Sequence, residues 1–466
     1  MSGPPRIIDT RRGLARIGFL SDPEPAMRKA SKGFAALLPL LCLLLSMAAH
    51  GTGTTAKGDW LLLPERVWTG DGDAAHAGWA VLVHDGAIAA VGPAASIQAP
   101  ANAHRVELPG ATLTPGLIDL HSHLFLHPYN ETLWNDQVLT EPQDYRTLEA
   151  AAHAKATLLA GFTTLRDLGT EGAGYADVSV KRAIEEGLIP GPRLFVATRA
   201  IVATASYGPG PRGFRPDLDL PGGAQEVSGV DAAMAAVREQ AARGADWIKI
   251  YGDYRVGPDG GTAPTFTPAE LKALVDTAHQ IGRPVAVHAA SDAGVRMAVE
   301  AGVDSIEHGY GASEATFRLL KQHGIAYEPT LTAVESTAEY FEHYVPGKSE
   351  PTERMREAER AFRTALKLDV TIGNGSDVGV FRHGDNWREP AAMVAYGMTP
   401  AQALHAATDV AAKILRQSQH VGRIAPGLAA DLAAFAGDPS TQIDALKKPV
   451  FVMKAGIPYR TPDMTP

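Results

Sequence analysis

The sequence is almost free of cysteine: Cys42 is the only one in 466 residues. A chain with a single thiol has no disulfide framework and no set of thiolate metal ligands, so a packed core must stabilise it. The sequence also lacks a basic excess, because its net charge is −9 at pH 7. Without a positive field to neutralise phosphates, nucleic acid is not expected as a partner.

Long hydrophobic runs are scarce as well. The apolar run at residues 34–45 is shorter than the roughly 20 residues that a membrane span needs. Basic residues precede this run and small residues follow it, which is the layout of a secretory signal peptide. We expect residues 27–50 to be a signal peptide and residues 1–26 to be a non-native extension before the true start at Met27. The mature protein is then exported, periplasmic or secreted, without stable membrane insertion. An uncleaved anchor is the alternative.

Short strand-like segments occupy both ends of the remaining chain. Residues 59–115 contain "WLLLPERVWTG" and "WAVLVHDGAIAAVG", which are broken by Gly, Asp-Gly and Pro turns. The same pattern returns over residues 417–466. Since neither end can bury a hydrophobic face alone, we expect the two to pair into one small β-sandwich domain, with the middle of the chain inserted between them.

Strand-like and helix-like segments alternate over residues 116–416. Helical stretches such as "VDAAMAAVREQAARG" end in glycine, as helices commonly do. Eight β/α units predict an α/β fold, a (β/α)8 TIM barrel with its active site at the C-terminal ends of the strands. The eight expected strands are "LIDLHSHL", "TTLRDLG", "RLFVATRAI", "DWIKIYGD", "PVAVHAA", "DSIEHGY", "IAYEPTL" and "VTIGNGSD".

The first of these strands ends in two polar rings, His121 and His123. Side chains two residues apart in a strand point to the same face, so the two imidazoles converge on one point, as a metal ion requires. A pair of hydrogen-bonded core histidines is the alternative. His288, His308 and Asp377 end later strands at the same end of the predicted barrel, which favours the metal site.

Lys249 lies inside the fourth strand, in "DWIKIYGDY". Alternation places Ile248 and Ile250 toward the helices, so Lys249 and Tyr251 face the barrel interior. A buried, unpaired ammonium tends to lose its proton. The neutral amine can capture carbon dioxide and become a carbamate, whose two oxygens can bridge two cations. A salt bridge between Lys249 and a carboxylate such as Asp253 is the alternative.

The segments "PGLIDLHSHL", "IKIYGD", "AVHAA", "SIEHG" and "NGSD", with the flanking β segments, resemble the binuclear amidohydrolase superfamily. Within it, the run from "GADWIKIYGDY" to "HGDNWREPAAMVAYGMTPAQALHAAT" resembles the Xaa-Pro dipeptidase (prolidase-like) and ochratoxinase group. The resemblance implies two zinc ions that share a hydroxide. The implied ligands are His121 and His123 for one zinc, His288 and His308 for the other, carboxylated Lys249 as the bridge and Asp377 on the first metal.

The same resemblance implies that the hydroxide attacks an amide carbonyl and that Asp377 passes its proton to the departing nitrogen. Tyr251 matches a tyrosine that binds a substrate carboxylate, so the expected substrate is an N-acyl amino acid, an Xaa-Pro dipeptide or an ochratoxin-A-like amide. The Gly-His stretch of relatives after the third strand is replaced by "IVATASYGPGPRG". Polar loop residues are a hypothesis for selecting an acidic or aromatic group: Tyr207, Arg212, Arg215 and Arg382.

Two other functions stay open. An imidazolonepropionase-like hydrolase of cyclic amides usually works with one metal and lacks the lysine, so Lys249 counts against it. A non-catalytic metal-binding scaffold usually loses ligands, whereas all six are present here. Relatives often assemble as rings, so we expect a homo-oligomer that acts on small molecules.

Overall fold

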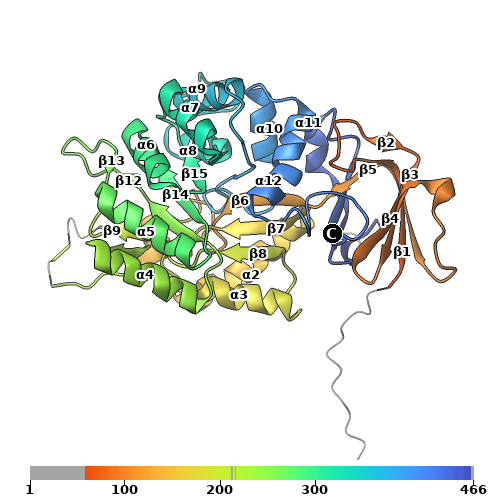
Figure 1. Ribbon diagram of the computed structural model, residues 1–466, viewed down its shortest axis with the longest axis horizontal. Helices are drawn as coiled ribbons and strands as arrows, with labels where there is room; N and C mark the ends of the chain where they lie inside the picture. The colour runs from red at the N-terminus through yellow and green to blue at the C-terminus, as the bar shows by residue number, and fades with distance from the viewer. Residues whose placement is uncertain (1–57, 211–213, 216, 463–466) are drawn as a thin grey trace, which may run out of the picture. The chain divides into compact units, whose positions relative to one another are not determined.

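The two ends of the chain share one sheet in the computed structural model, which describes residues 58–210, 214–215 and 217–462 (Figure 1). The expected signal peptide, the expected extension and Arg212 lie outside these residues, so export stays a prediction. Among the described residues, no helix combines the length and the apolar composition that crossing a membrane requires.

This terminal sheet has eight strands, in the order β19-β18-β17-β5-β1-β3-β4 with β2 paired to β1. Strands β5 and β17 join the two ends antiparallel, with Thr114 opposite Ala433. Buried residues such as Leu62, Val81 and Phe451 form a core against it. A second layer, which a sandwich requires, stays a prediction. The strands are β1 (Trp60–Val67), β2 (His76–Ala77), β3 (Trp79–His84), β4 (Ala87–Pro93), β5 (His104–Pro115), β17 (Leu432–Ala436), β18 (Pro449–Lys454) and β19 (Ile457–Arg460).

Parallel strands fill the middle of the chain in two groups. One sheet has the order β6-β7-β8, and the other the order β10-β9-β11-β14-β15-β16. A two-stranded ribbon, β12 (Asp253–Tyr254) with β13 (Ala263–Pro264), follows β11. The parallel strands are β6 (Leu117–Ser122), β7 (Phe162–Asp167), β8 (Arg193–Val196), β9 (Ile201–Ala203), β10 (Gln225–Val227), β11 (Ile248–Tyr251), β14 (Val285–Ala289), β15 (Ser305–His308) and β16 (Ala326–Glu328).

The expected eighth strand is an irregular segment at residues 371–378. It forms only single bridges, Tyr327 with Ile372 and Ser122 with Val378. The chain runs very close to both neighbours there: a Cβ added at Gly375 would lie 3.0 Å from the Cβ of His121. Backbone hydrogen bonds still connect residues 371–378 to β16 and to β6. The other end of the β6-β7-β8 sheet is also connected: the amide of Asp246, shortly before β11, donates a hydrogen bond to the carbonyl of Val196 in β8 (2.8 Å).

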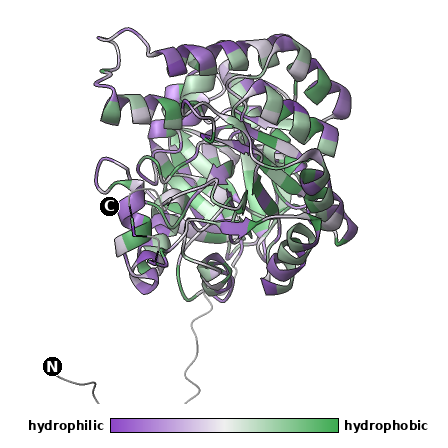
Figure 2. Cartoon of the chain, turned by 90° about the vertical axis from the view of Figure 1, so that its left-hand side faces the viewer, coloured by the Kyte–Doolittle hydropathy of each residue, from purple (hydrophilic) through white to green (hydrophobic). Residues whose placement is uncertain are grey.

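Helices cover the outer side of the parallel strands (Figure 1). Figure 2 shows mainly hydrophobic strands inside and polar outer helix faces. Three helices end at glycines with left-handed backbone, Gly244, Gly302 and Gly324, as the sequence predicts. The helices are α1 (Trp134–Thr140), α2 (Gln143–Leu159), α3 (Ala176–Glu185), α4 (Val230–Arg243), α5 (Pro268–Gln280), α6 (Asp292–Ala301), α7 (Glu314–His323), α8 (Leu331–Phe341), α9 (Glu353–Lys367), α10 (Arg388–Ala395), α11 (Pro400–Ala406) and α12 (Asp409–Ile414).

Asp119 fixes β6 to the irregular segment. Its buried carboxylate accepts hydrogen bonds from the amide of His121 (3.1 Å), from the amide and hydroxyl of Ser376, and from Nδ2 of Asn386 (2.7 Å). Because His121 and Asp377 sit directly beside these contacts, the same carboxylate sets the distance between two expected ligands.

We expect Asp119→Ala to destabilise the protein, because it leaves several buried donors without an acceptor. The cost is about 3 kcal/mol, which lowers the thermal unfolding midpoint by about 3–4 °C. Scanning calorimetry on Asp119→Ala and on Asp219→Ala, a matched loss of an exposed carboxylate, provides the measurement. An unchanged midpoint in Asp119→Ala would contradict this role.

Candidate active site

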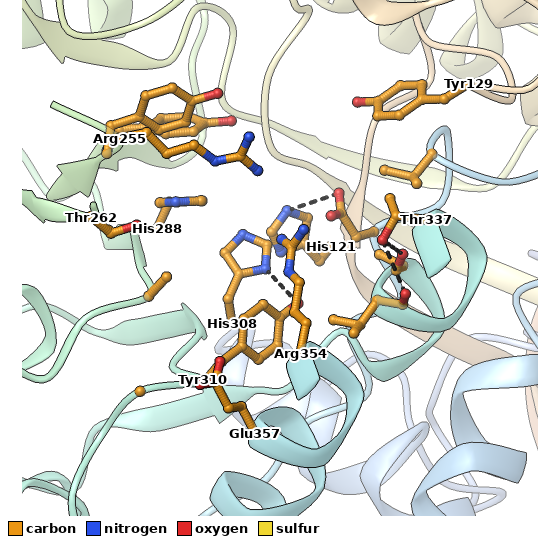
Figure 3. A pocket seen from close by; sticks show the side chains of 18 of the residues that line it. His121, Tyr129, Arg255, Thr262, His288, His308, Tyr310, Thr337, Arg354 and Glu357 are labelled. Atoms are coloured by element: carbon orange, nitrogen blue, oxygen red, sulfur yellow. Dashed lines mark hydrogen bonds and ion pairs between the residues drawn. The ribbon is translucent and has the colours of Figure 1, made fainter. Parts of the chain in front are cut away.

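Four histidine rings lie side by side at the C-terminal ends of the parallel strands. The ring centroids of His121 and His123 are 5.3 Å apart, those of His121 and His308 are 5.1 Å apart, and those of His308 and His288 are 4.4 Å apart. All four rings line one cavity of about 650 Å³, into which Figure 3 looks. The expected histidines are therefore brought together.

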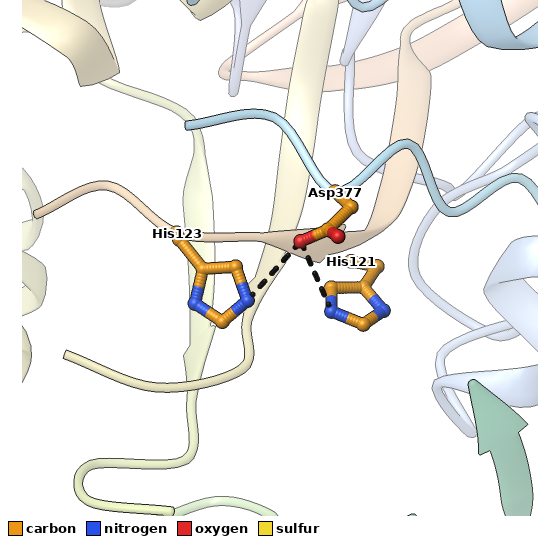
Figure 4. Close-up of side chains that lie close together, drawn as sticks. All are labelled: His121, His123 and Asp377. Atoms are coloured by element: carbon orange, nitrogen blue, oxygen red, sulfur yellow. Dashed lines mark ion pairs between the residues drawn. The ribbon is translucent and has the colours of Figure 1, made fainter. Parts of the chain in front are cut away.

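Asp377 joins this group from the irregular segment. Its Oδ1 lies 3.5 Å from Nε2 of His121 and 3.3 Å from Nε2 of His123 (Figure 4). The three side chains offer ligand atoms within 4.8 Å of one another. Burial alone would raise the pKa of the Asp377 carboxyl, but the neighbouring His121 and His123 hold it below its usual range. The aspartate is thus an anion in contact with two imidazoles.

Three of the rings are held through Nδ1. A hydrogen bond at Nδ1 fixes the orientation of the ring and leaves Nε2 free to bind a metal ion, as in most histidine metal ligands. The partners are Oε2 of Glu307 for His121 (2.8 Å), the carbonyl of Gly169 for His123 (2.9 Å) and Oγ1 of Thr330 for His308 (2.8 Å). His288 is turned differently, with Nε2 3.9 Å from Oδ1 of Asp253.

Glu307 belongs to a buried ion pair beneath the rings. Arg166 donates from Nη2 to Oε1 of Glu307 (2.9 Å), and its guanidinium stacks on Trp247 at 4.3 Å. Burial opposes ionisation of Glu307, but Arg166 and His121 lower its pKa to about 2. The sequence pattern did not single out Arg166 or Glu307, although "LRDLG" and "SIEHG" lie in the expected strands that carry them.

Lys249 is completely buried, as the alternation of β11 predicts. Ile248 and Ile250 point to the other side of β11, where they pack with buried residues of the surrounding helices. Within the described ranges, Nζ of Lys249 has no hydrogen-bond partner and no ion pair. The alternative partner, Asp253, instead accepts from the amides of Ala290 and Ser291. Burial lowers the pKa of Lys249 to about 8.

Tyr251 lines the cavity and stacks on His288, with ring centroids 4.5 Å apart. Its hydroxyl lies 3.4 Å from Oε1 of Glu171, a buried residue of the loop after β7. Tyr207 also lines the cavity and donates to Oε2 of Glu171 (2.7 Å). The sequence pattern did not single out Glu171; the polar loop "GTEGAG" directly after β7 was the available signal.

Two loop arginines of the substrate hypothesis lie elsewhere. Arg215 pairs with Asp217, and Arg382 pairs with Asp385 at 3.1 Å. Neither is among the residues that line the cavity. Arg255 and Arg354 occupy the rim of the cavity instead (Figure 3).

The amidohydrolase family model matches residues 112–460. The chain belongs to the amidohydrolase family. It is a hydrolase that acts on amide or other C–N bonds. This confirms the resemblance found in the sequence. The matched region contains the parallel strands and also β17, β18 and β19 of the terminal sheet.

Three relatives show where the chain lies within the family. It is 30% identical over 417 residues to an ochratoxinase of Aspergillus niger, covering 83% of this chain and 84% of the relative. A crystal structure of a Xaa-Pro dipeptidase with bound methionine is 30% identical and superimposes with a TM-score of 0.76 over 86% of this chain and all of that one. An imidazolonepropionase of Aeromonas salmonicida is 26% identical, over 76% of this chain and 84% of the relative.

We expect Glu307→Gln to weaken metal binding by about 10- to 100-fold, since outer-shell partners of ligating histidines have effects of that size. The glutamine can present its NH2 group to Nδ1 of His121, which would leave the proton on Nε2, facing the centre. Zinc titration with a fluorescent competitor measures the change.

Glu328→Gln is the matched control for this variant. Glu328 is equally buried, but burial and the charge of Glu307 raise its pKa far above the ordinary value, so a neutral amide resembles its uncharged state. Equal zinc affinities of the two variants would show that the charge of Glu307 does not act through His121.

Proposed function

We propose that this amidohydrolase is a binuclear zinc enzyme built on a closed (β/α)8 barrel. His121 and His123 would hold one ion, His288 and His308 the other, with carboxylated Lys249 as the bridge and Asp377 on the first ion. One observation carries the proposal: among the described residues, the completely buried amine of Lys249 has no hydrogen-bond partner and lies close to four imidazoles and a carboxylate. These five groups come from the ends of β6, β14 and β15 and from the segment 371–378.

The donor set fits such a centre. Neutral imidazoles and carboxylates are good zinc ligands. A lysine amine whose pKa is lowered to about 8 loses its proton more readily near neutral pH than an ordinary lysine does. That amine can attack carbon dioxide and release a proton, which turns a buried cation into an anionic bridging ligand. The bonds that connect residues 371–378 to β6 and β16 favour closure of the barrel around the site.

When bound, two such cations would polarise an amide carbonyl and lower the pKa of water at the site. Asp377 is placed for proton transfer, because its carboxylate is anionic and exposed to the cavity. We propose that it accepts the proton of the attacking water and donates it to the amide nitrogen as the C–N bond breaks. His121 and His123 orient Asp377 for both transfers.

The relatives with known substrates suggest an amide whose leaving group is a carboxylate-bearing amino acid: an N-acyl amino acid, an Xaa-Pro-type dipeptide or an ochratoxin-A-like compound. Tyr251 remains a candidate substrate-binding residue because it lines the cavity. A cyclic-amide hydrolase of the imidazolonepropionase kind is the second candidate, favoured only by the more distant sequence match. The complete ligand set argues against a non-catalytic scaffold.

We expect Lys249→Ala to lose the bridge between the metals. Bound zinc would fall from about two ions per chain to one or fewer, and kcat/KM would fall at least about 100-fold. Plasma emission spectrometry and an amidase assay provide the two measurements. Lys155→Ala, which removes an exposed lysine of α2, serves as the control. Two tightly held zinc ions in Lys249→Ala would rule out the bridging role.

The substrate class is tested with four groups of compounds offered to zinc-loaded enzyme: Xaa-Pro dipeptides, N-acyl amino acids, ochratoxin A and imidazolonepropionate. We expect hydrolysis of compounds that release an amino acid with a free carboxylate, detected by mass spectrometry. Exclusive turnover of imidazolonepropionate would support the second candidate and overturn the first.

A further inference from the structure

Arg146 is a buried arginine of α2 whose guanidinium binds the backbone of two active-site loops. It is only 2% exposed. Nε and Nη2 donate to the carbonyl of Phe125 (3.1 and 2.8 Å), and Nη1 donates to the carbonyl of Glu171 (2.8 Å). A longer bond connects Nη2 to the carbonyl of Thr170 (3.3 Å). Phe125 follows β6 and Thr170 follows β7, so one side chain holds the C-terminal ends of two neighbouring parallel strands together.

These bonds are strong because their donor is charged. Burial lowers the pKa of the Arg146 guanidinium, whereas the charges of Glu171, Glu141 and Glu149 raise it. An arginine keeps its proton in a protein, and hydrogen bonds from a charged donor are roughly twice as strong as neutral ones. All the hydrogen bonds that Arg146 donates among the described residues go to backbone carbonyls, so its charge acts directly on the course of the two loops.

His123 lies between the two points that Arg146 holds. The backbone of His123 is two residues before Phe125. Nδ1 of its ring donates to the carbonyl of Gly169 (2.9 Å), which directly precedes Thr170. Arg146 therefore holds both the strand end that carries the imidazole and the turn that orients it.

The turn after β7 has a backbone that needs support from its surroundings. Glu171 has a positive φ of 48°, which a non-glycine residue keeps only where its surroundings enforce it. The Nη1 bond from Arg146 to the carbonyl of Glu171 is one such contact. The next residue, Gly172, is packed against the same guanidinium, because a Cβ added there would lie 3.4 Å from Nη1 of Arg146. The turn that begins at Gly169 is thus packed around the Arg146 side chain.

The other half of the candidate site is held by different parts of the chain. His288 and His308 belong to β14 and β15, and Nδ1 of His308 is bound to Oγ1 of Thr330 (2.8 Å). In the part of the chain that the structure describes, Arg146 donates no hydrogen bond to either of these strands. Its contacts are confined to the side of the site that carries His123.

We infer that Arg146 is a positioning residue for His123 and, through this ring, for one of the two metal ions of the proposed centre. The guanidinium holds the loops after β6 and β7 in the arrangement that turns the imidazole inward. Loss of the guanidinium weakens the ion on His121 and His123 and spares the ion on His288 and His308. The inference rests on the proposed binuclear function and deepens it.

The test uses Arg146→Met, which keeps the length of the side chain but donates no hydrogen bond, in two backgrounds. His308→Ala leaves chiefly the ion on His121 and His123, whereas His123→Ala leaves chiefly the other ion. We expect Arg146→Met to weaken zinc binding about 10- to 100-fold in the His308→Ala background, which is the size of outer-shell effects on metal affinity. Zinc binding in the His123→Ala background should stay unchanged. Titration against a fluorescent competitor measures both affinities.

Two further variants separate positioning from folding. Arg146→Lys keeps the charge and part of the hydrogen bonding, so we expect an intermediate zinc affinity. The lysine variant also carries the comparison if Arg146→Met does not fold. Arg182→Met removes an arginine of α3 whose side chain is 77% exposed, and it should leave zinc binding unchanged.

Hydrogen exchange on the metal-free protein measures the loops directly. Backbone amides of residues 168–174 should exchange faster in Arg146→Met, because the turn loses its charged donor and opens more often. The amides of β15 should exchange at the same rate as in the unmodified protein.

The outcomes separate the two proposals. Equal weakening of zinc binding in both backgrounds would overturn the positioning inference, because it would indicate a general loss of stability. Unchanged zinc binding in the His308→Ala background, or unchanged exchange of residues 168–174, would also overturn it. Fewer than two zinc ions on the unmodified protein would instead overturn the proposed binuclear function, and the exchange measurement would still decide whether Arg146 holds the loops.

Discussion

The buried pair of Arg166 and Glu307 is the interaction on which the site depends. It keeps a charged carboxylate beneath the ring of His121, where burial alone would protonate it. The carboxylate in turn binds Nδ1 of His121 and so points Nε2 at Asp377. Removing either charge would leave the other uncompensated in a low-dielectric interior, which is strongly destabilising. The orientation of His121, a candidate ligand, is thus tied to the stability of the buried interior around Arg166 and Glu307.

Two buried glutamates of this interior, Glu307 and Glu328, have opposite pKa shifts because their neighbours differ. Glu307 is ionised because Arg166 and His121 are its direct partners, whereas Glu328 lies 3.9 Å from Arg166 and is kept neutral by burial and by Glu307. One arginine therefore balances one carboxylate. Among the described residues Lys249 forms no ion pair, and burial lowers the pKa of its amine, which in the proposal favours carboxylation.

Sequence periodicity was sufficient to predict most of the parallel strands, the grouping of the candidate ligands and the inward side of Lys249, because these depend on local alternation. It did not predict that the third expected strand divides into β8 and β9 of different sheets, or that the eighth is irregular. It was not sufficient for Glu307. Alternation places Glu307 and His308 on opposite faces of β15, yet both contact the interior. The left-handed backbone of His308 (φ 74°) explains this, since it ends the alternation and turns the ring back. The cavity residues Glu171, Tyr207 and Arg354 come from separate loops and a distant helix, so no local pattern connects them.

Four non-glycine residues with left-handed backbone lie at the site: Glu171, His308, Thr330 and Asp377 all have a positive φ. Each such residue costs of order 1–3 kcal/mol and persists only where the surroundings enforce it. Here the enforcing contacts are specific. Thr330 binds the ring of His308, and the amide of Asp377 donates to the carbonyl of His121 (2.8 Å). These bonds hold His308 and Asp377 in place before anything binds, so the protein bears the cost of arranging the candidate ligands during folding.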